Sequence, residues 1–218
     1  MNSEMADFIK SQTVLAKPTI VPEIELYLAT EITPLWQITE ERLKGGNLPP
    51  PYWAFAWPGG QGLARYALDH PGEIKGKRVL DFGAGCGIAA IAAAKAGAKA
   101  ALADDIDMLA QAATLLNAAH NNAVVKIHRV LDMEKAPANI DLIFAGDVCY
   151  QQAMSAIVLR WLYLCIAAGV RVLIADPGRA YMPKEGLKEL IRYDVPTSRE
   201  LEDRDNRTVV LSELLLPE

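Results

Sequence analysis

The sequence predicts an α/β fold, a mostly parallel sheet that helices cover on both faces and that ends in an antiparallel hairpin. Between residues 77 and 176, short aliphatic runs alternate with helical stretches, which is typical of parallel strands joined by helices. A glycine-rich turn follows the first run, as expected where a strand passes into a helix at a ligand site. After Pro183 the alternation stops, and two apolar stretches flank the charged turn EDRDNR (202–207).

The individual elements follow from hydrophobic pattern and from the residues that end each segment. We expect strands over 78–82, 98–105, 124–130, 141–147 and 170–177. We expect helices over 60–70, 87–97, 107–122 and 152–169. After residue 183 we expect one short helix and then two strands. The proline-rich segment 49–60 is not expected to form regular helix. Residues 1–48 are expected to form an N-terminal arm or cap on a domain that spans 49–218.

Composition and charge limit the function classes. The chain has 218 residues, of which 51% are hydrophobic, so it can build one domain with a substantial core. The net charge is −5, and no more than two cations are adjacent. A nucleic acid partner would need a basic surface, so we expect none.

Other features predict a cytoplasmic protein. The apolar run 156–175 is interrupted by Arg160, Gly169 and Arg171, which favours a buried helix and strand over a membrane span. The N-terminus (MNSEMADFIKSQ) lacks the pattern of a signal peptide. Three cysteines are an odd number without metal-ligand spacing, so we expect a reducing compartment and no metal. The oligomeric state cannot be predicted.

The glycine-rich turn reads VLDFGAGCGI (79–88), with glycines at 83, 85 and 87. Glycine allows a sharp turn and lets a ligand lie against the backbone. The dinucleotide pattern G-x-G-x-x-G fails here, because Ile88 stands where its third glycine would be. Asp81 would repel a phosphate but suits a ligand that carries an ammonium or sulfonium group. The pattern therefore favours a nucleoside without phosphate, such as S-adenosylmethionine, over NAD.

Two more acidic residues follow later strands. Asp105 lies 20 positions after Gly85, where a carboxylate can accept both ribose hydroxyls. Asp132, in VLDM, follows the third strand, where the edge of an adenine would lie. Each aspartate alone could be a helix cap. Their order, each at the carboxyl end of a strand, favours an S-adenosylmethionine site.

In sequence order, VLDFGAGCG, ADDID, VLDM and GDVCY resemble the seven-strand class I methyltransferases. The segments 22–36, 49–71 and 146–150 resemble, more narrowly, the electron-transfer flavoprotein β-subunit lysine methyltransferases, relatives of the ribosomal protein L11 methyltransferases. The resemblance implies a Rossmann-like, seven-stranded sheet with a C-terminal hairpin, S-adenosylmethionine as cofactor, S-adenosylhomocysteine as product, and a lysine of the flavoprotein β subunit as acceptor. It implies cofactor contacts from Trp57, Asp81, Gly83, Ala84, Gly85, Gly87, Asp105, Ile106, Asp132, Met133 and Gly146. One departure is Met133, where related enzymes often carry tryptophan.

The family motif D-x-x-Y maps onto Asp147 and Tyr150, the expected catalytic residues. Methyl transfer is a direct displacement, so alignment of the acceptor matters more than acid–base chemistry. Asp147 could hold the acceptor amine by a hydrogen bond, and Tyr150 could form an aromatic wall beside it. Alternatively, Asp147 could only cap the helix that begins near Gln151. The aromatic side chains at 53, 55 and 57 could line the site or pack in the core.

Four other functions remain open from the sequence. One is a small-molecule N-methyltransferase, and another is a methyltransferase of a different protein, such as a ribosomal protein. A third is a nucleoside-sensing module without turnover, which the intact Asp147 and Tyr150 disfavour. The fourth is an NAD oxidoreductase, which Ile88 disfavours. Methylation of a flipped base is also disfavoured, because GDVCY lacks the two prolines common at that place.

Overall fold

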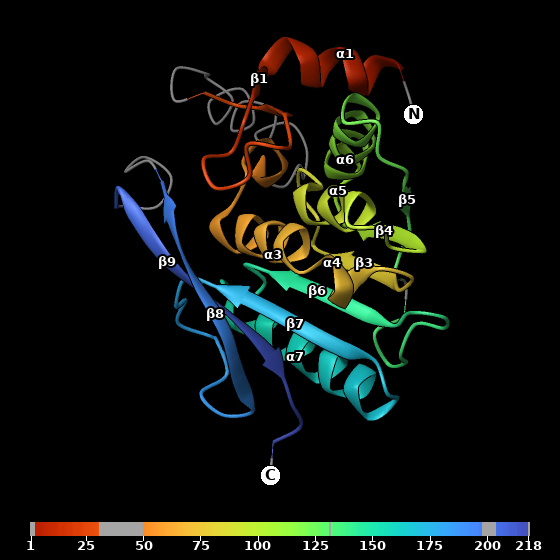
Figure 1. The fold of residues 1–218 in the computed structure, drawn as a ribbon, viewed down its shortest axis with the longest axis vertical. Helices are drawn as coiled ribbons and strands as arrows, with labels where there is room; N and C mark the ends of the chain where they lie inside the picture. Colours follow the sequence, from red (N-terminus) through yellow and green to blue (C-terminus); the bar gives the residue numbers. More distant parts are fainter. Residues whose placement is uncertain (1–2, 31–49, 131, 198–203, 218) are drawn as a thin grey trace.

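The computed structural model describes residues 3–30, 50–130, 132–197 and 204–217 (Figure 1). Within these residues, the main sheet has seven strands in the order β5-β4-β3-β6-β7-β9-β8. The strands are β3 (Arg78–Phe82), β4 (Ala100–Asp104), β5 (Val125–Ile127), β6 (Leu142–Gly146), β7 (Arg171–Asp176), β8 (Leu187–Pro196) and β9 (Asn206–Leu214). Neighbouring strands from β5 to β7 are parallel, whereas β9 is antiparallel to both β7 and β8. The expected mostly parallel sheet with a C-terminal hairpin is confirmed.

Helices cover both faces of this sheet (Figure 1). One face carries α3 (Pro58–Asp69), α5 (Ile88–Lys95) and α6 (Met108–His120), and the other carries α7 (Gln152–Ala167). The short α4 (Pro71–Ile74) leads from α3 into β3. The N-terminal part contributes α1 (Ser3–Gln12), β1 (Val14–Ala16) and β2 (Leu26–Leu28), and η1 (Tyr52–Ala54) precedes α3.

The two faces bury alternate residues of the same strands. On β6, Leu142 and Phe144 belong to the core under α3 and α5, whereas Ile143 and Ala145 belong to the core under α7. All four side chains are fully buried. Successive side chains of a strand point to opposite faces, so a strand covered on both sides must be apolar throughout. This explains why the central strands read as unbroken aliphatic runs.

Two expectations about the elements were wrong. The short helix expected after residue 183 is absent from the described residues, because Leu187–Pro196 forms the strand β8 and pairs with β9 along its length. Tertiary pairing here overrides the helix propensity of the stretch LKEL. Segment 49–60 was expected to lack regular helix, yet α3 begins at Pro58. Proline is suited to the first position of a helix, where its missing N–H would have no partner.

The apolar run at 156–175 forms the end of α7, a turn at Gly169 with φ of 86°, and β7. It is therefore a buried helix and strand, as expected. In the part of the chain that the structure describes, no helix is both long and apolar enough to cross a membrane.

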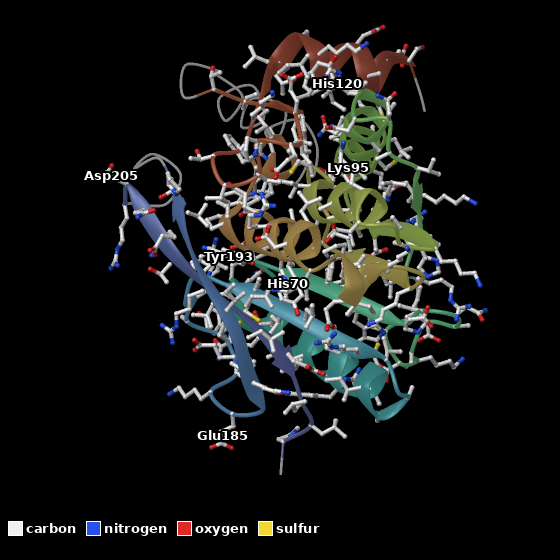
Figure 2. The ribbon with its side chains drawn as sticks, viewed as in Figure 1. His70, Lys95, His120, Glu185, Tyr193 and Asp205 are labelled. Atoms are coloured by element: carbon white, nitrogen blue, oxygen red, sulfur yellow. The ribbon has the colours of Figure 1, made fainter. Side chains whose placement is uncertain are left out.

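The N-terminal arm packs on the sheet domain. β1 and β2 form an antiparallel pair, and Val21, Ile24 and Leu26 are fully buried in the core shared with α3 and α5. Figure 2 shows His120, at the end of α6, beside this arm; its ring lies 2.8 Å from the Glu25 carboxylate. The expected boundary after residue 48 falls within 31–49, outside the described residues, so the division into arm and domain stays a prediction.

Candidate functional site

The glycine loop lies at the carboxyl edge of the sheet, between β3 and α5. Gly83, Gly85 and Gly87 all have positive φ values, of 69°, 54° and 81°, a conformation that other residues rarely adopt. A Cβ atom on Gly87 would also lie 2.7 Å from the Cγ2 of Thr114 on α6. The backbone of this loop therefore requires all three glycines of the predicted motif.

Asp105 joins the end of β4 to the glycine loop. One carboxylate oxygen accepts the Gly85 N–H at 2.9 Å, and the other accepts the Asp107 N–H at 2.9 Å. Each oxygen of an ionised carboxylate has two lone pairs, so Asp105 can accept further hydrogen bonds from hydroxyl groups. Burial raises the pKa of Asp105. The cap of α6 is Asp107, which accepts the Leu109 N–H, so Asp105 is not merely the helix cap considered from the sequence.

Asp81 lies behind the loop and is 4% exposed. Its carboxylate accepts the Ala90 N–H, in the first turn of α5, at 2.9 Å. Burial raises the pKa of Asp81 to about 7; the Ala90 hydrogen bond opposes that rise, and the negative Asp105 adds to it. Asp81 thus supports α5 from within the sheet, and it lies close enough to sense the charge of Asp105.

The end of β6 meets the first turn of α3 without space for side chains. A Cβ atom on Gly146 would lie 2.9 Å from the Gly60 nitrogen, and one on Gly59 would lie 2.3 Å from the Ala175 carbonyl oxygen. The predicted site residue Gly146 is therefore needed for the approach of α3 to the sheet. Because of this contact, the N-terminus of α3 reaches the residue that follows β6.

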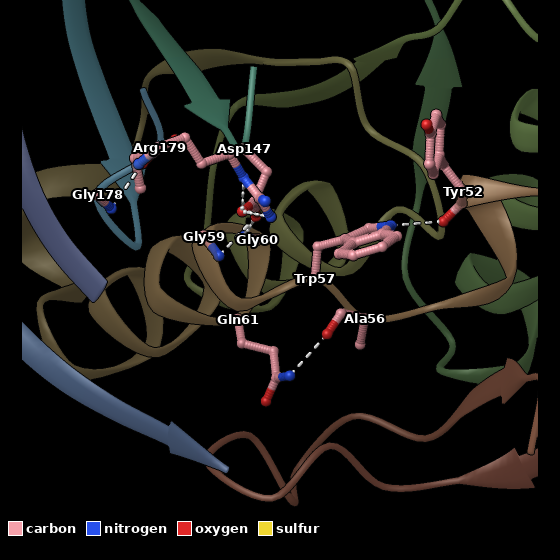
Figure 3. A network of polar contacts seen from close by, with 10 residues as sticks. Tyr52, Ala56, Trp57, Gly59, Gly60, Gln61, Asp147, Gly178 and Arg179 are labelled. Atoms are coloured by element: carbon pink, nitrogen blue, oxygen red, sulfur yellow. Dashed lines mark hydrogen bonds and ion pairs between the residues drawn. The ribbon is translucent and has the colours of Figure 1, made fainter. Parts of the chain in front are cut away.

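Asp147 directly follows β6, and four hydrogen-bond donors surround its carboxylate (Figure 3). Oδ2 accepts the Gly59 N–H at 2.6 Å and the Gly60 N–H at 3.3 Å. Oδ1 accepts Nη2 of Arg179 at 2.9 Å and its Nε at 3.3 Å. Asp147 therefore caps α3; the considered alternative, that it caps the helix beginning near Gln151, was wrong, because that helix has no side-chain cap.

The Asp147 carboxylate is largely shielded from water, since the side chain is only 10% exposed. Burial raises the pKa of Asp147 to about 6, and the cation of Arg179 opposes that rise. The nearby carboxylate of Asp176 also raises it. Asp176 accepts the N–H groups of Gly178 and Arg179, and so shapes the turn that carries Arg179 after β7.

Arg179 was not predicted from the sequence. It lies three residues beyond the end of β7, at the same sheet edge as Asp147, and its guanidinium carbon is 5.8 Å from the centroid of the Trp57 ring. The sequence did contain a signal for it. The carboxyl ends of parallel strands meet at one edge of a sheet, so a cation just after β7 is expected near a carboxylate just after the neighbouring strand β6.

An aromatic group borders this network. The ring of Tyr52 packs edge-to-face against Tyr150, with centroids 5.5 Å apart, and against Trp57, at 5.7 Å. Nε1 of Trp57 donates to the Tyr52 carbonyl at 2.8 Å, as Figure 3 shows. Tyr150 is 44% exposed, whereas Trp53 is 2% exposed and packs in the core with Ile9. Trp53 therefore has the packing role, and the exposed aromatic surface comes from the other rings.

The residues predicted to contact the adenine lie in a part of the site that is less closely assembled. β5 ends at Ile127, earlier than expected, so Asp132 follows a loop rather than a strand. Asp132 accepts the Glu134 N–H at 2.9 Å and forms an ion pair with Lys135. A buried aspartate that was not predicted, Asp104, holds this loop by accepting the Val130 N–H at 2.6 Å.

The remaining predicted cofactor residues differ widely in exposure. Met133 packs against the core under α7, and Ala84 is 9% exposed within the glycine loop. Ile106 is 88% exposed directly after Asp105, which leaves an apolar side chain in solvent beside the loop. An apolar ring system placed over Ile106 would remove that surface from water.

The residues at this edge fit S-adenosylmethionine. The glycine loop offers bare backbone, Asp105 retains lone pairs for ribose hydroxyls, and Ile106 offers an apolar surface for a purine. The carboxylates of Asp81 and Asp105 suit a cationic ligand better than a phosphate. Among the described residues, no three His, Cys, Asp or Glu side chains gather as metal ligands would.

Comparison with known proteins agrees with this fold. The model of the ribosomal protein L11 methyltransferase family matches residues 65–148. The magnesium protoporphyrin IX methyltransferase of Synechocystis PCC 6803, solved with bound S-adenosylhomocysteine, has the same fold, with a TM-score of 0.50, 16% identity, and coverage of 84% of this chain and 96% of that one. The sheet order, the hairpin and the glycine loop define the class as a class I S-adenosylmethionine-dependent methyltransferase.

The sequence relatives narrow the class to a family. The electron transfer flavoprotein β-subunit lysine methyltransferase of Danio rerio is 37% identical over 203 residues, which cover 89% of this chain and 77% of the relative. The human protein of that name is 39% identical over 184 residues, covering 82% of this chain and 68% of the relative. This chain belongs to the family of electron-transfer flavoprotein β-subunit lysine methyltransferases. The resemblance noted in the sequence is thereby confirmed.

Proposed function

We propose that this protein transfers methyl groups from S-adenosylmethionine to lysine side chains of the electron-transfer flavoprotein β subunit. The observation that carries the proposal is the alignment with a relative of that name over 77% of the relative's length. A cytoplasmic location is part of the proposal and rests on the odd number of cysteines without metal-ligand spacing, which favours a reducing compartment.

On the cofactor side, we assign the binding role to the residues of the glycine loop and to the other residues that the family resemblance implies. They are Trp57, Asp81, Gly83, Ala84, Gly85, Gly87, Asp105, Ile106, Asp132, Met133 and Gly146. The cofactor supplies an electrophilic methyl group on sulfur. Asp105 would accept the ribose hydroxyls, and the loop would offer backbone contact without steric hindrance.

On the acceptor side, we assign Asp147 to hold the amine. Its four lone-pair positions already face four donors, of which the Gly60 N–H and the Arg179 Nε are the most distant, at 3.3 Å each. An amine can therefore bind Asp147 most readily by displacing one of these two long contacts. Once the ammonium group has lost a proton to water, the neutral amine held there could aim its lone pair at the methyl group, which is what a direct displacement needs, and the sulfur would leave as the thioether of S-adenosylhomocysteine.

Tyr150 would form the wall of the acceptor site together with Tyr52. Both rings are partly exposed, at 44% and 37%, and they meet edge-to-face. The face of an aromatic ring attracts a cation, so the pair would favour an amine that is protonated or already methylated. Burial raises the pKa of Tyr150, so its hydroxyl stays protonated near neutral pH and can donate a hydrogen bond.

Labelling of cell extract tests the proposed acceptor. Extract of host cells that lack this protein is incubated with the purified protein and S-adenosylmethionine labelled in its methyl group. The proposal predicts one principal labelled protein, of the size of the flavoprotein β subunit, and much weaker label with Asp147→Asn. Label in ribosomal protein L11 or in a small metabolite would refute the proposed acceptor and leave the methyltransferase class intact.

A further inference from the structure

One side chain on α6 connects the N-terminal arm to the glycine loop. Asn117 is fully buried. Its amide oxygen accepts the Tyr27 N–H of β2 at 2.8 Å, and its amide nitrogen donates to the Cys86 carbonyl of the loop at 2.9 Å. An N–H partner on one side and a carbonyl on the other fix which end of the amide faces which segment. Both contacts are thus made by one rigid group.

The glycine loop rests on the same face of α6. The Thr114 hydroxyl, one turn before Asn117, donates to the Gly85 carbonyl at 3.1 Å. Two successive carbonyls of the loop, at Gly85 and Cys86, therefore bond to α6. Because a peptide group is planar, fixing its carbonyl also fixes its N–H. The shape of the loop is consequently set by α6 as well as by its own glycines.

The arm also contacts η1, the short helix before α3. The Ala29 N–H, just after β2, donates to the Ala54 carbonyl of η1 at 2.8 Å. η1 starts the aromatic segment that contains Tyr52 and leads to Trp57. Through Asn117 and Ala29, one short stretch of the arm contacts both the loop under the cofactor and the aromatic segment beside it.

Asn121 provides an internal comparison. It lies one turn after Asn117, and its amide oxygen accepts the Glu25 N–H at 3.1 Å while its nitrogen donates to the Glu25 carbonyl at 2.7 Å. Asn121 thus binds the same arm through the same chemistry. None of its hydrogen bonds in the described structure reaches the glycine loop.

We infer that Asn117 couples docking of the N-terminal arm to cofactor binding, as a positioning residue that acts through the Cys86 carbonyl. When the cofactor binds and orders the loop, the contact between Asn117 and Tyr27 is strengthened. In the other direction, docking of the arm raises the affinity for the cofactor. Such coupling is reciprocal by thermodynamic necessity. The inference rests on the proposed cofactor, and it requires nothing of the acceptor.

Binding measurements on two matched variants test the coupling. Calorimetry with S-adenosylhomocysteine is carried out on the wild type, Asn117→Ala and Asn121→Ala. The dissociation constant should rise by at least about fivefold in Asn117→Ala, the lower end of usual couplings between sites. In Asn121→Ala it should change by less than about twofold, because the arm stays docked through its buried side chains Val21, Ile24 and Leu26 and keeps its link to the loop through Asn117. An unchanged constant in Asn117→Ala, or an equal loss in both variants, would overturn the inference.

Hydrogen exchange gives a second readout that a purely structural role would not produce. In the wild type, saturating S-adenosylhomocysteine should slow amide exchange in the peptide that covers 24–30 by about fivefold or more. The same protection should persist in Asn121→Ala and disappear in Asn117→Ala. If Asn117→Ala fails to fold, the wild-type result decides: absence of protection at 24–30 refutes the coupling. Loss of binding in the wild type itself would refute the proposed cofactor, which distinguishes the two failures.

Discussion

Replacing Asp81 with asparagine is expected to stabilise the fold at alkaline pH while weakening cofactor binding. Asp81 is 4% exposed, and its carboxylate accepts a hydrogen bond from the Ala90 N–H. An asparagine oxygen can accept the same bond. The substitution therefore removes a buried charge and keeps the cap on α5.

The size of the effect follows from linkage. Burial raises the pKa of Asp81 to about 7 from the ordinary aspartate value of 3.8, so the folded protein binds this proton more tightly than the unfolded chain does. A carboxyl group whose pKa is higher in the folded protein than in the unfolded chain stabilises the fold at pH values below its unfolded-state pKa. This stabilisation is lost as the pH rises through its folded-state pKa. The two values differ by about three units, so the wild type should lose about 4 kcal/mol of unfolding free energy between pH 4 and pH 8 from this group.

Urea unfolding of the apoprotein at pH 4.5 and pH 8 measures this loss. Asp81→Asn should show a smaller decrease between these two conditions than the wild type, by about 2–4 kcal/mol because part of the titration lies outside the range. Asp141→Asn is the control with the opposite sign. Arg78 holds the pKa of Asp141 at about 2, so that carboxylate stabilises the fold above pH 4. Its removal should cost about 1 kcal/mol or less at pH 8, since the ion pair is exposed. Equal pH dependence in the wild type and Asp81→Asn would refute the argument from burial.

Three further outcomes are expected. Asp105→Ala should weaken S-adenosylhomocysteine binding by about tenfold to a hundredfold in calorimetry, through loss of about 1.5–3 kcal/mol of hydrogen bonding; an unchanged affinity would leave the Asp105 carboxylate with a structural role only, through its contacts to Gly85 and Asp107. Asp147→Asn should keep cofactor affinity and reduce single-turnover methylation by about 10²-fold, because the amide loses the charge that attracts and orients an amine; wild-type turnover would remove Asp147 from the mechanism. Gly146→Ala should lower the melting temperature by several degrees, since its Cβ would lie 2.9 Å from the Gly60 nitrogen; an unchanged melting temperature would show that α3 can move away.

The central strands could be predicted from the sequence because both of their faces are buried. A strand such as β6 has no solvent face, so its limits appear as the limits of an aliphatic run. β8 could not be predicted in the same way. Its first half carries helix-forming residues, and a bulge between Glu189 and Ile191 interrupts the alternation. Only beyond Ile191 do buried and exposed residues alternate as in a strand with one face in solvent.

The candidate site was predictable where a single segment defines it. The glycine loop and Asp105 follow from local spacing, and the structure joins them by the hydrogen bond from Gly85 to Asp105. The surroundings of Asp147 were not predictable, because its partners lie 87 and 88 residues earlier, at the N-terminus of α3, and 32 residues later, at Arg179. Sequence patterns describe neighbours along the chain, so the cap weighed as an alternative for Asp147 was the helix that follows it rather than α3.

Asn117 shows a further limit. A buried asparagine in an alanine-rich helix gives no sign of which backbone groups it binds. Its partners, at Tyr27 and Cys86, are 90 and 31 residues away. Only the packing of the arm against α6 brings them together.

Methylation of purified electron-transfer flavoprotein β subunit, followed by peptide mass spectrometry, tests the central claim most directly. The wild-type protein and S-adenosylmethionine should add methyl groups to defined lysines, and Asp105→Ala should add them more slowly at low cofactor concentration and recover at high concentration. A β subunit that stays unmethylated, with a wild-type protein that binds S-adenosylhomocysteine normally, would contradict the proposed function.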